Sequence, residues 1–291
     1  MEGSDGVEVV VAAEAELGEG PVWDARSGRL AWVDILAGRI LLTDVRSGAT
    51  EVIPVPLHVG AVAPRAAGGF IAALQDGFWV VADGPPRRIA PVPEAPAGMR
   101  FNDGKCDPAG RFWAGTMAYD QTAGAGALYR LDPGGRAIKV LEGVTISNGL
   151  AWSVDGRTMY HVDTPTQRID AFSFRPETGE ISDRRPLVAI PAASGAPDGM
   201  TIDAEGGLWV ALWGGAAVHR YVDGRLDRVI SLPVSQPTSC AFGGEGLDEL
   251  FVTSAWEGLS AAERRGHPLA GAVFRVRPGV RGLPAAVYNG V

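Results

Sequence analysis

Four polar residues that could bind a metal ion recur at one position of a repeated sequence pattern. Glu19, Asn102, Asn148 and Asp198 stand eight or nine residues before a glycine, in phrases that read EGPVWDARSG, NDGKCDPAG, NGLAWSVDG and DGMTIDAEG. Two carboxylates with one or two amide oxygens form a hard, oxygen-only ligand set. Such a set suits Ca²⁺, Mg²⁺ or Mn²⁺ better than Zn²⁺, which prefers His and Cys. With water in the other positions, the ion could be catalytic.

Each of these residues also has a simpler explanation, because Asn-Gly, Asp-Gly and Glu-Gly pairs are common in turns. Their repetition favours a site. Weaker copies of the pattern begin at Gly60 and Thr238, which makes six repeats in all. Repeated units stack the same local geometry around one body, so equivalent positions meet in space. The spacing therefore predicts a ring of oxygen-bearing side chains that converge on one point.

The repeats have the length of propeller blades. Their central glycines are 40, 42, 46, 50 and 40 residues apart, and units of this length with about four strands each are typical of β-propellers. In the first unit the strands are expected over 21–23, 30–33, 39–44 and 50–55. The valine-rich residues 7–11 are expected to complete the last blade and close the ring, which removes open sheet edges. We predict an all-β, six-bladed β-propeller, a single domain over residues 1–291, with a metal site at one mouth of its channel.

Composition argues against several kinds of partner. The chain has 26 Lys and Arg against 34 Asp and Glu, a net charge of −8, whereas binding to nucleic acid needs clustered basic residues. No apolar stretch approaches the length of a membrane span, and residues 1–17 lack the pattern of a signal peptide. Two cysteines, Cys106 and Cys240, are too few for a disulfide framework. We expect a cytoplasmic monomer that binds neither nucleic acid nor membranes.

Longer segments around these phrases resemble the SMP-30/gluconolactonase family, also called the regucalcin-like group. They read LGEGPVW (17–23), RFNDGKCDPAGRFWAGTM (100–117), SNGLAWSVDGRTMYHVDT (147–164) and PDGMTIDAEGGLWVALWGG (197–215), in the family's order and spacing. The resemblance implies a six-bladed propeller with one divalent metal ion. It also implies hydrolysis of a sugar lactone, such as gluconolactone or a pentonolactone, to the aldonic acid. Ca²⁺ is the favoured ion, and Mg²⁺, Mn²⁺, Zn²⁺ and Fe²⁺ are the alternatives.

Residue by residue, the resemblance implies three metal ligands: Glu19, Asn148 and Asp198. It implies that Arg100 and Asn102 contact the substrate. The family's acidic substrate contact falls at Asp120, where many relatives have Glu. Because the Asp side chain is shorter, the identity of the sugar stays undetermined. Asp198 is also the candidate catalytic base, through the carboxylate oxygen that does not bind the metal. The alternative is a metal-bound hydroxide, which would need no separate base.

Other functions stay open at this point. The same site could hydrolyse another ester or an organophosphate, and a propeller of this kind could be a calcium-binding regulatory protein without catalysis or an interaction scaffold. Arg100 beside the candidate ligands favours catalysis, because a calcium sensor has no need of it. The motifs Gly-x-Ser-x-Gly and His-Glu-x-x-His are absent from the sequence, so serine-hydrolase and zincin chemistry have no support.

Several smaller expectations concern the remaining residues. Residues 258–265 are the best candidate for a helix, and Trp32, Trp113 and Trp209 are expected to pack in the core. Tyr119 could enter the pocket. His58 stands two residues before Gly60, so both a place at the channel mouth and a place in a surface loop fit it.

Overall fold

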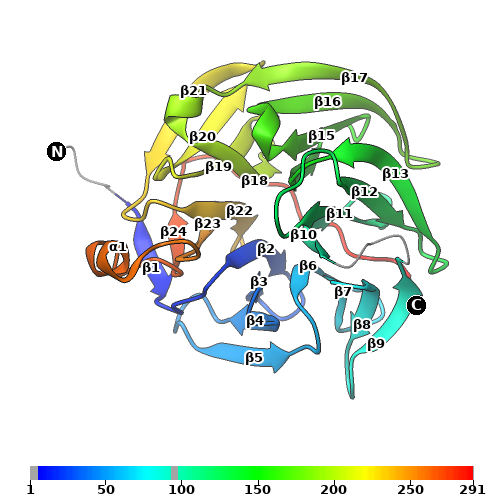
Figure 1. Cartoon of the computed structure of the whole chain (residues 1–291), viewed down its shortest axis with the longest axis horizontal. Helices are drawn as coiled ribbons and strands as arrows, with labels where there is room; N and C mark the ends of the chain where they lie inside the picture. Colours follow the sequence, from blue (N-terminus) through cyan, green and yellow to red (C-terminus); the bar gives the residue numbers. More distant parts are fainter. Residues whose placement is uncertain (1–5, 93–97, 291) are drawn as a thin grey trace.

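The computed structural model describes residues 6–92 and 98–290, which form six four-stranded sheets around a central channel (Figure 1). The innermost strands are β2 (Gly18–Asp24), β6 (Val59–Pro64), β10 (Met99–Cys106), β14 (Ser147–Trp152), β18 (Ala196–Ile202) and β22 (Pro237–Gly243). The second strands are β3 (Arg29–Asp34), β7 (Phe70–Leu74), β11 (Phe112–Ala118), β15 (Thr158–Asp163), β19 (Leu208–Trp213) and β23 (Glu249–Ser254). The third strands are β4 (Arg39–Thr43), β8 (Gly77–Val81), β12 (Gly126–Leu131), β16 (Arg168–Arg175), β20 (Ala217–Val222) and β24 (Val273–Val276). The outermost strands are β5 (Thr50–Pro54), β9 (Arg87–Pro91), β13 (Ala137–Val144), β17 (Glu180–Ala189), β21 (Arg225–Ser231) and β1 (Glu8–Val11). The predicted all-β, six-bladed propeller is confirmed.

The last blade is built from both ends of the chain. β1 pairs antiparallel with β24, with Glu8 opposite Arg275 and Val9 opposite Phe274. The order β1-β24-β23-β22 follows, so the N-terminal strand is the outer edge of a blade made otherwise of C-terminal residues. This arrangement confirms the role predicted for residues 7–11. The pairing closes the ring, and it leaves no unpaired edge on β24, the third strand of the last blade.

In the third and fifth blades a buried tryptophan and a buried aspartate tie the second strand to the turn that precedes it. Trp32, Trp113 and Trp209 are fully buried, as predicted. The indole nitrogens of Trp113 and Trp209 donate to Oδ2 of Asp107 (2.9 Å) and of Asp203 (2.8 Å). The same aspartates accept backbone N–H groups of their turns. One buried carboxylate therefore fixes both the turn and the tryptophan behind it.

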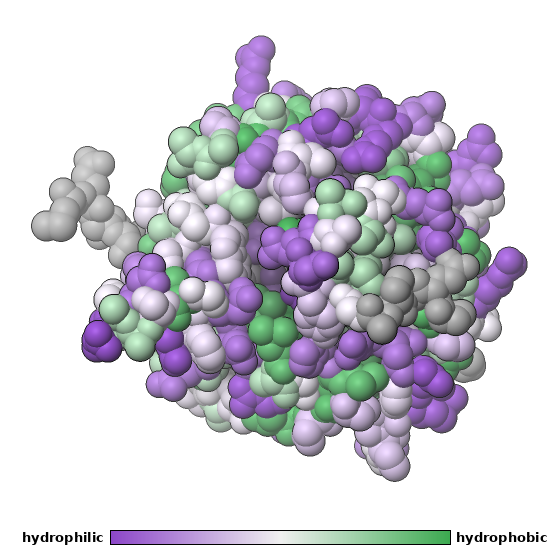
Figure 2. All heavy atoms as spheres, in the orientation of Figure 1, coloured by the Kyte–Doolittle hydropathy of each residue, from purple (hydrophilic) through white to green (hydrophobic). Residues whose placement is uncertain are grey.

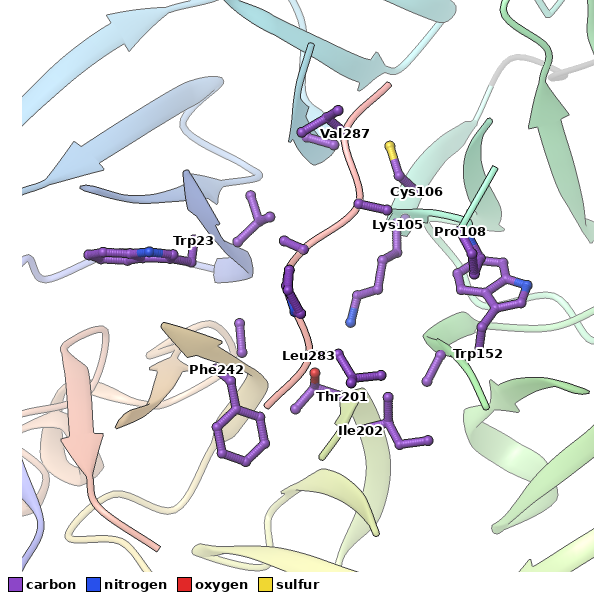
Figure 3. A pocket seen from close by; sticks show the side chains of 18 of the residues that line it. Trp23, Lys105, Cys106, Pro108, Trp152, Thr201, Ile202, Phe242, Leu283 and Val287 are labelled. Atoms are coloured by element: carbon purple, nitrogen blue, oxygen red, sulfur yellow. The ribbon is translucent and has the colours of Figure 1, made fainter. Parts of the chain in front are cut away.

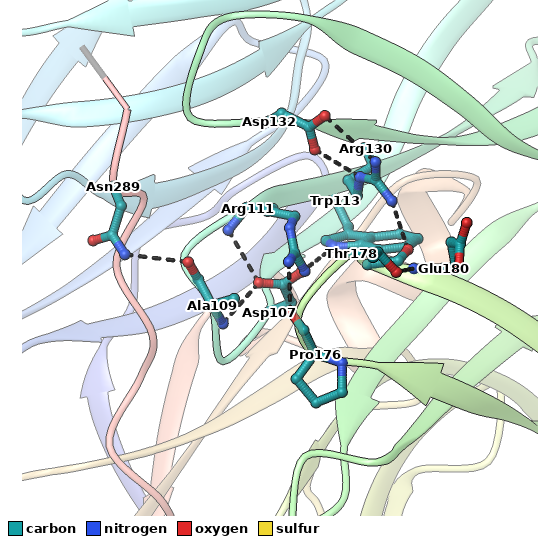
Figure 4. Close-up of polar contacts among 11 residues, drawn as sticks. Asp107, Ala109, Arg111, Trp113, Arg130, Asp132, Pro176, Thr178, Glu180 and Asn289 are labelled. Atoms are coloured by element: carbon teal, nitrogen blue, oxygen red, sulfur yellow. Dashed lines mark hydrogen bonds and ion pairs between the residues drawn. The ribbon is translucent and has the colours of Figure 1, made fainter.

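The third blade is also bonded to the fourth through these groups (Figure 4). Arg111 Nη1 donates to Asp107 Oδ2 at 2.9 Å, and its Nη2 donates to the carbonyl of Pro176. Arg130 Nη1 donates to the carbonyl of Gly179 at 2.6 Å. Both arginines are buried, so these bonds lie out of water, where a lost partner is costly. They hold the two blades that carry Asn102 and Asn148 in one orientation.

Helices are few among the described residues. α1 (Ala261–Gly266) begins three residues later than the start predicted at 258, because Ser260 caps it in a capping box with Glu263. Two 3₁₀ turns, η1 (Thr164–Thr166) and η2 (Ala192–Ser194), complete the set. In this part of the chain no helix is long and apolar enough to span a membrane. Figure 2 shows an indentation near the centre of the ring face, bordered by both hydrophilic and hydrophobic side chains.

Candidate active site

The residues that lead the repeats lie at irregular points of the innermost strands. In each of β2, β6, β10, β14, β18 and β22 the pairing register with the second strand shifts at or next to that residue. Such bulges insert an extra residue and re-aim a side chain. This geometry explains why the polar residues recur at one phase of the pattern. The bulge turns the side chains of Glu19, Asn102, Asn148 and Asp198 away from the regular pleat, and all four are buried.

The glycines that follow the candidate ligands have a structural reason. A Cβ atom added at Gly149 would lie 2.8 Å from the carbonyl oxygen of Asp198, closer than real Cβ contacts come. Gly149 therefore lets β14 and β18 approach each other where Asn148 and Asp198 stand. Gly20, after Glu19, has a φ of +52°, in the left-handed region that favours glycine. The glycines of these Glu-Gly and Asn-Gly pairs therefore allow close packing of the innermost strands around the channel.

Hydrogen bonds connect the predicted site residues of the third and fourth blades. Asn102 Nδ2 donates to Asn148 Oδ1 at 2.9 Å and to the carbonyl of Ser147 at 3.0 Å. Arg100 Nη1 donates to Asn102 Oδ1 at 2.6 Å. Asn148 Nδ2 in turn donates to Thr164 Oγ1 at 2.7 Å. The chain of bonds fixes both amides, so their oxygens and the guanidinium of Arg100 are oriented in advance.

Three buried carboxylates interact at the same place. Burial raises the pKa of Glu19 well above its usual range, and the nearby charges of Asp198 and Asp103 raise it further. Burial also raises the pKa of Asp198 well above its usual range, with Asp103 adding to the effect. The buried guanidinium of Arg100 opposes both shifts. Sequence reasoning counted Asp103, directly after Asn102, among the residues that favour catalysis but gave it no role as a ligand or a substrate contact.

The donor chemistry fits a divalent cation. Glu19 and Asp198 are buried and close enough to influence each other's pKa, and a positive charge beside them would stabilise their ionised forms. Within residues 6–92 and 98–290, no group of three or more His, Cys, Asp and Glu side chains is arranged to hold a metal. A centre built on Glu19 and Asp198 therefore relies on an amide oxygen, and Asn148 is the amide predicted for it. Oxygen ligands of this kind are those of Ca²⁺, Mg²⁺ and Mn²⁺.

Aromatic and polar residues form the rim above Arg100. The Arg100 guanidinium lies 5.9 Å from the centre of the Tyr119 ring, and the Tyr119 hydroxyl is 2.6 Å from His58 Nδ1. These contacts place His58 at the mouth that Arg100 faces, the first of the two positions considered for it. Asp120 is exposed, and its Oδ1 accepts from the backbone and hydroxyl of Thr122 at 3.0 and 2.8 Å. No contact joins Asp120 to the buried residues within the described chain, so its substrate role stays a prediction.

The structure is a six-bladed β-propeller with buried carboxyl groups at one end of its channel. Comparison with known proteins identifies the family within this class of fold. Residues 17–256 match the model of the SMP-30/Gluconolactonase/LRE-like region, so the chain belongs to that family. It is 37% identical over 280 residues to the putative sugar lactone lactonase YvrE of Bacillus subtilis, covering 95% of this chain and 96% of that protein. It is 38% identical to regucalcin of Homo sapiens, covering 98% of each chain.

Solved structures agree with this assignment. A calcium-binding protein, regucalcin, from Agrobacterium tumefaciens superposes with a TM-score of 0.93 at 31% identity, covering 97% of both chains. A luciferin-regenerating enzyme superposes with a TM-score of 0.90 at 32% identity, covering 97% of this chain and 99% of that one. The predicted family is confirmed, and a lactonase-type function has the support of these relatives.

Proposed function

We propose that this protein is a metal-dependent lactonase that hydrolyses a sugar lactone to the aldonic acid. The observation that carries the proposal is the buried pair of carboxyl groups of Glu19 and Asp198, which interact with each other, set beside the oriented amide of Asn148 and the guanidinium of Arg100. Membership of the SMP-30/Gluconolactonase/LRE-like family supports it, as does the similarity to a putative sugar lactone lactonase.

In this proposal Glu19, Asn148 and Asp198 hold one divalent ion, with Ca²⁺ favoured. When bound, such an ion acts as a Lewis acid toward the lactone carbonyl. The chain's own groups perform the rest. Among the described residues Arg100 donates through Nη1 alone, to Asn102 Oδ1 and to the carbonyl of Phe101, so its other N–H groups are available to substrate oxygens. Asn102 holds Arg100 in place, and both fix the attack geometry.

Asp198 is the proposed general base. Its carboxylate takes a proton from the attacking water, whose oxygen adds to the lactone carbonyl carbon. The bond between that carbon and the ring oxygen then breaks. The ring oxygen leaves as a hydroxyl once it has gained the proton, and the product is a carboxylic acid. Asp120 would bind sugar hydroxyls at the rim, where solvent reaches it.

The alternative within this family is a calcium-binding regulatory propeller without catalysis. Arg100 argues against this alternative. Burial lowers the pKa of its guanidinium, so keeping this charge buried costs free energy, and a site that only binds a cation gains nothing from a second positive charge nearby. A substrate with several oxygen acceptors would offset the cost of burying the guanidinium, because it would accept hydrogen bonds from Arg100. The same residues would also serve another ester or an organophosphate.

A panel of lactones tests the proposal. D-Glucono-, D-xylono-, L-arabinono- and D-galactonolactone are mixed with metal-stripped protein, and acid release is followed with a pH indicator. Ca²⁺, Mg²⁺, Mn²⁺, Zn²⁺ and Fe²⁺ are then restored one at a time. We expect turnover above the spontaneous rate with at least one ion and one lactone. Folded, ion-loaded protein that accelerates none of them would leave the non-catalytic alternative or another ester substrate.

A further inference from the structure

A cavity lies in the channel, formed by the parts of the innermost strands that follow the candidate metal ligands. It has a volume of about 660 Å³ and is lined by the later residues of innermost strands and by residues 283–287 (Figure 3). Glu19, Arg100, Asn102, Asn148 and Asp198 are not among its lining residues. Gly20 and Asp103 do line it, so the cavity begins next to the candidate site and extends away from it, and its size is that of small-molecule sites.

The floor of this cavity is the C-terminal segment 281–289, which crosses the ring. Gly282 pairs with Asp203, after β18, and Tyr288 is held by the carbonyl of Pro64 at the end of β6. The Tyr288 hydroxyl also donates to the carbonyl of Asp132 at 3.0 Å. Both ends of the crossing segment are thus anchored to opposite parts of the ring. Between them, residues 283–287 face the cavity.

The walls are mainly apolar, and three charged residues are among them: Lys105, Asp103 beside it and Asp155 in the turn 153–156. Trp23, Trp152, Ile202, Phe242 and Leu283 contribute side chains, and Figure 3 shows Lys105 extending into the space between them. Its ammonium donates one hydrogen bond, to the carbonyl of Met200 at 2.6 Å. The structure gives no second acceptor and no ion-pair contact for it among the described residues.

The unused hydrogen-bond capacity of Lys105 indicates the kind of ligand. An ammonium group has three N–H donors, and only one is used here. Asp103 attracts the charge through space, but its Oδ1 is already bonded to the backbone N–H of Gly104 at 2.6 Å. A buried cation of this kind is stabilised by an anionic acceptor that reaches it. The apolar walls require that the rest of the ligand be apolar.

We propose that this cavity is a second binding site, which takes a small monocarboxylate with an apolar body and binds its carboxylate at Lys105. The cavity reaches the surface at the turn 153–156, where Val154 is 55% exposed. Asp155 lies in this turn, where its Oδ1 accepts from the Ser153 hydroxyl and from the backbone N–H of Arg157. The site uses none of the residues proposed to hold the metal ion or to act on the lactone, although Asp103, which lines the cavity, also interacts with Glu19 and Asp198.

The lysine content of the chain makes a direct test possible. The sequence holds two lysines, Lys105 and Lys139, and Lys139 lies on β13 at the rim of its blade. Protein grown with lysine labelled with ¹³C and ¹⁵N at its ε-carbon and ζ-nitrogen gives one side-chain signal for each. Decanoate is titrated below its micelle concentration, with decanol and decyltrimethylammonium as ligands of the same body and a neutral or positive head. We expect decanoate to shift the Lys105 signal and leave the Lys139 signal in place.

Variants separate the charge from the cavity. Lys105→Met keeps an unbranched apolar side chain, and we expect it to weaken decanoate binding about ten- to one-hundred-fold. Decanol should bind the two proteins within about two-fold of each other. Lys139→Met is the matched control, with unchanged affinity for decanoate. Ala285→Trp, at an exposed position of the crossing segment, should fill the space and weaken both ligands.

Several outcomes would overturn the proposal. Equal affinity for decanoate and decyltrimethylammonium would remove the role of the ammonium group. A decanoate-induced shift at Lys139 alone, or at neither lysine, would remove the site. If Lys105→Met does not fold, as thermal unfolding would show, the titration of the labelled parent protein and of Ala285→Trp still decides the question.

Discussion

Asp198 has two proposed duties, as a metal ligand and as the base that takes a proton from water. Replacing it with asparagine keeps the size of the side chain but removes the negative charge and the base. We expect Asp198→Asn to lower kcat by about a thousand-fold or more, since a general base alone contributes about 10²–10⁴-fold. The ion should also bind more weakly. Initial rates with the preferred lactone and calorimetric titration of the metal measure the two effects.

The exposed aspartate Asp248 supplies the control, since Asp248→Asn changes the net charge of the chain equally without touching the channel. A variant at Asp198 that keeps full activity would contradict both duties. Loss of activity with unchanged metal affinity would support the role of Asp198 as the base and contradict its role as a metal ligand.

Asp120 belongs to the rim, where its carboxylate is exposed and bonded to Thr122. If it binds sugar hydroxyls, Asp120→Ala should raise KM about ten-fold, which is the loss of a hydrogen bond to a charged group of about 1.4 kcal/mol. We expect kcat to stay within about two-fold, because the reacting carbonyl lies deeper. Steady-state kinetics over a range of lactone concentrations separate the two constants. An unchanged KM would assign Asp120 to the turn alone.

Within the blades, Asp203 is the clearest stabilising group. Its fully buried carboxylate accepts from the Trp209 indole, from Arg220 Nε at 2.7 Å and from two backbone N–H groups. Asp203→Ala leaves these donors buried without an acceptor. We expect a loss of about 3–5 kcal/mol in the free energy of unfolding, which urea denaturation measures.

Arg220 has a second, more exposed partner that provides the comparison. Asp227 contacts Arg220 Nη1 at 2.8 Å with a side chain that is 40% exposed, so Asp227→Ala should cost less than about 1 kcal/mol. Equal losses for the two variants would show that the buried network does not stabilise the blade as described.

The repeat pattern was a good guide to the blades and to the position of the site. The strand predicted over 30–33 is observed over Arg29–Asp34, and all six leading residues lie at register shifts of innermost strands. Alternation and turn residues are local signals, so they are visible in the sequence. The six-fold phase then brings Glu19, Asn102, Asn148 and Asp198 to one mouth.

Features that depend on distant pairing could not be predicted in this way. The crossing segment 281–289 has no repeat pattern. The hydroxyl of Tyr288 in this segment donates to the carbonyl of Asp132, 156 residues away. The position of Lys105 in a mainly apolar cavity depends on this segment and on residues of all six blades. The contact between His58 and Tyr119 likewise joins residues 61 positions apart.

For the molecule as a whole, His161 links stability to pH. Burial lowers the pKa of His161 from its usual 6.5 to about 4, and the charge of Arg184 adds to the shift. Its Nε2 lies 2.9 Å from Ser147 Oγ. Above pH 6.5 the ring is neutral in both the folded and the unfolded chain. As the pH falls from 6.5 toward 4, the unfolded chain takes up a proton that the folded chain excludes, so stability decreases.

We expect this single group to remove about 2–3 kcal/mol of stability by pH 4.5. His161→Gln keeps an amide near Ser147 but does not titrate, so it lacks this contribution. Urea unfolding of both proteins between pH 7.5 and 4.5 gives the difference between their free energies of unfolding at each pH. That difference should shift in favour of the variant as the pH falls. A constant difference would mean that His161 titrates alike in both states.

The central claim is that one divalent ion, held by Glu19, Asn148 and Asp198, is required for lactone hydrolysis. The most direct measurement is a titration of metal-stripped protein with Ca²⁺ in which ion binding and the rate of lactone hydrolysis are followed in the same samples. The account predicts one ion per chain, with the rate rising in proportion to occupancy and no rate above the spontaneous one at zero occupancy. Full hydrolysis by the stripped protein, or full occupancy without hydrolysis of any lactone in the panel, would contradict it.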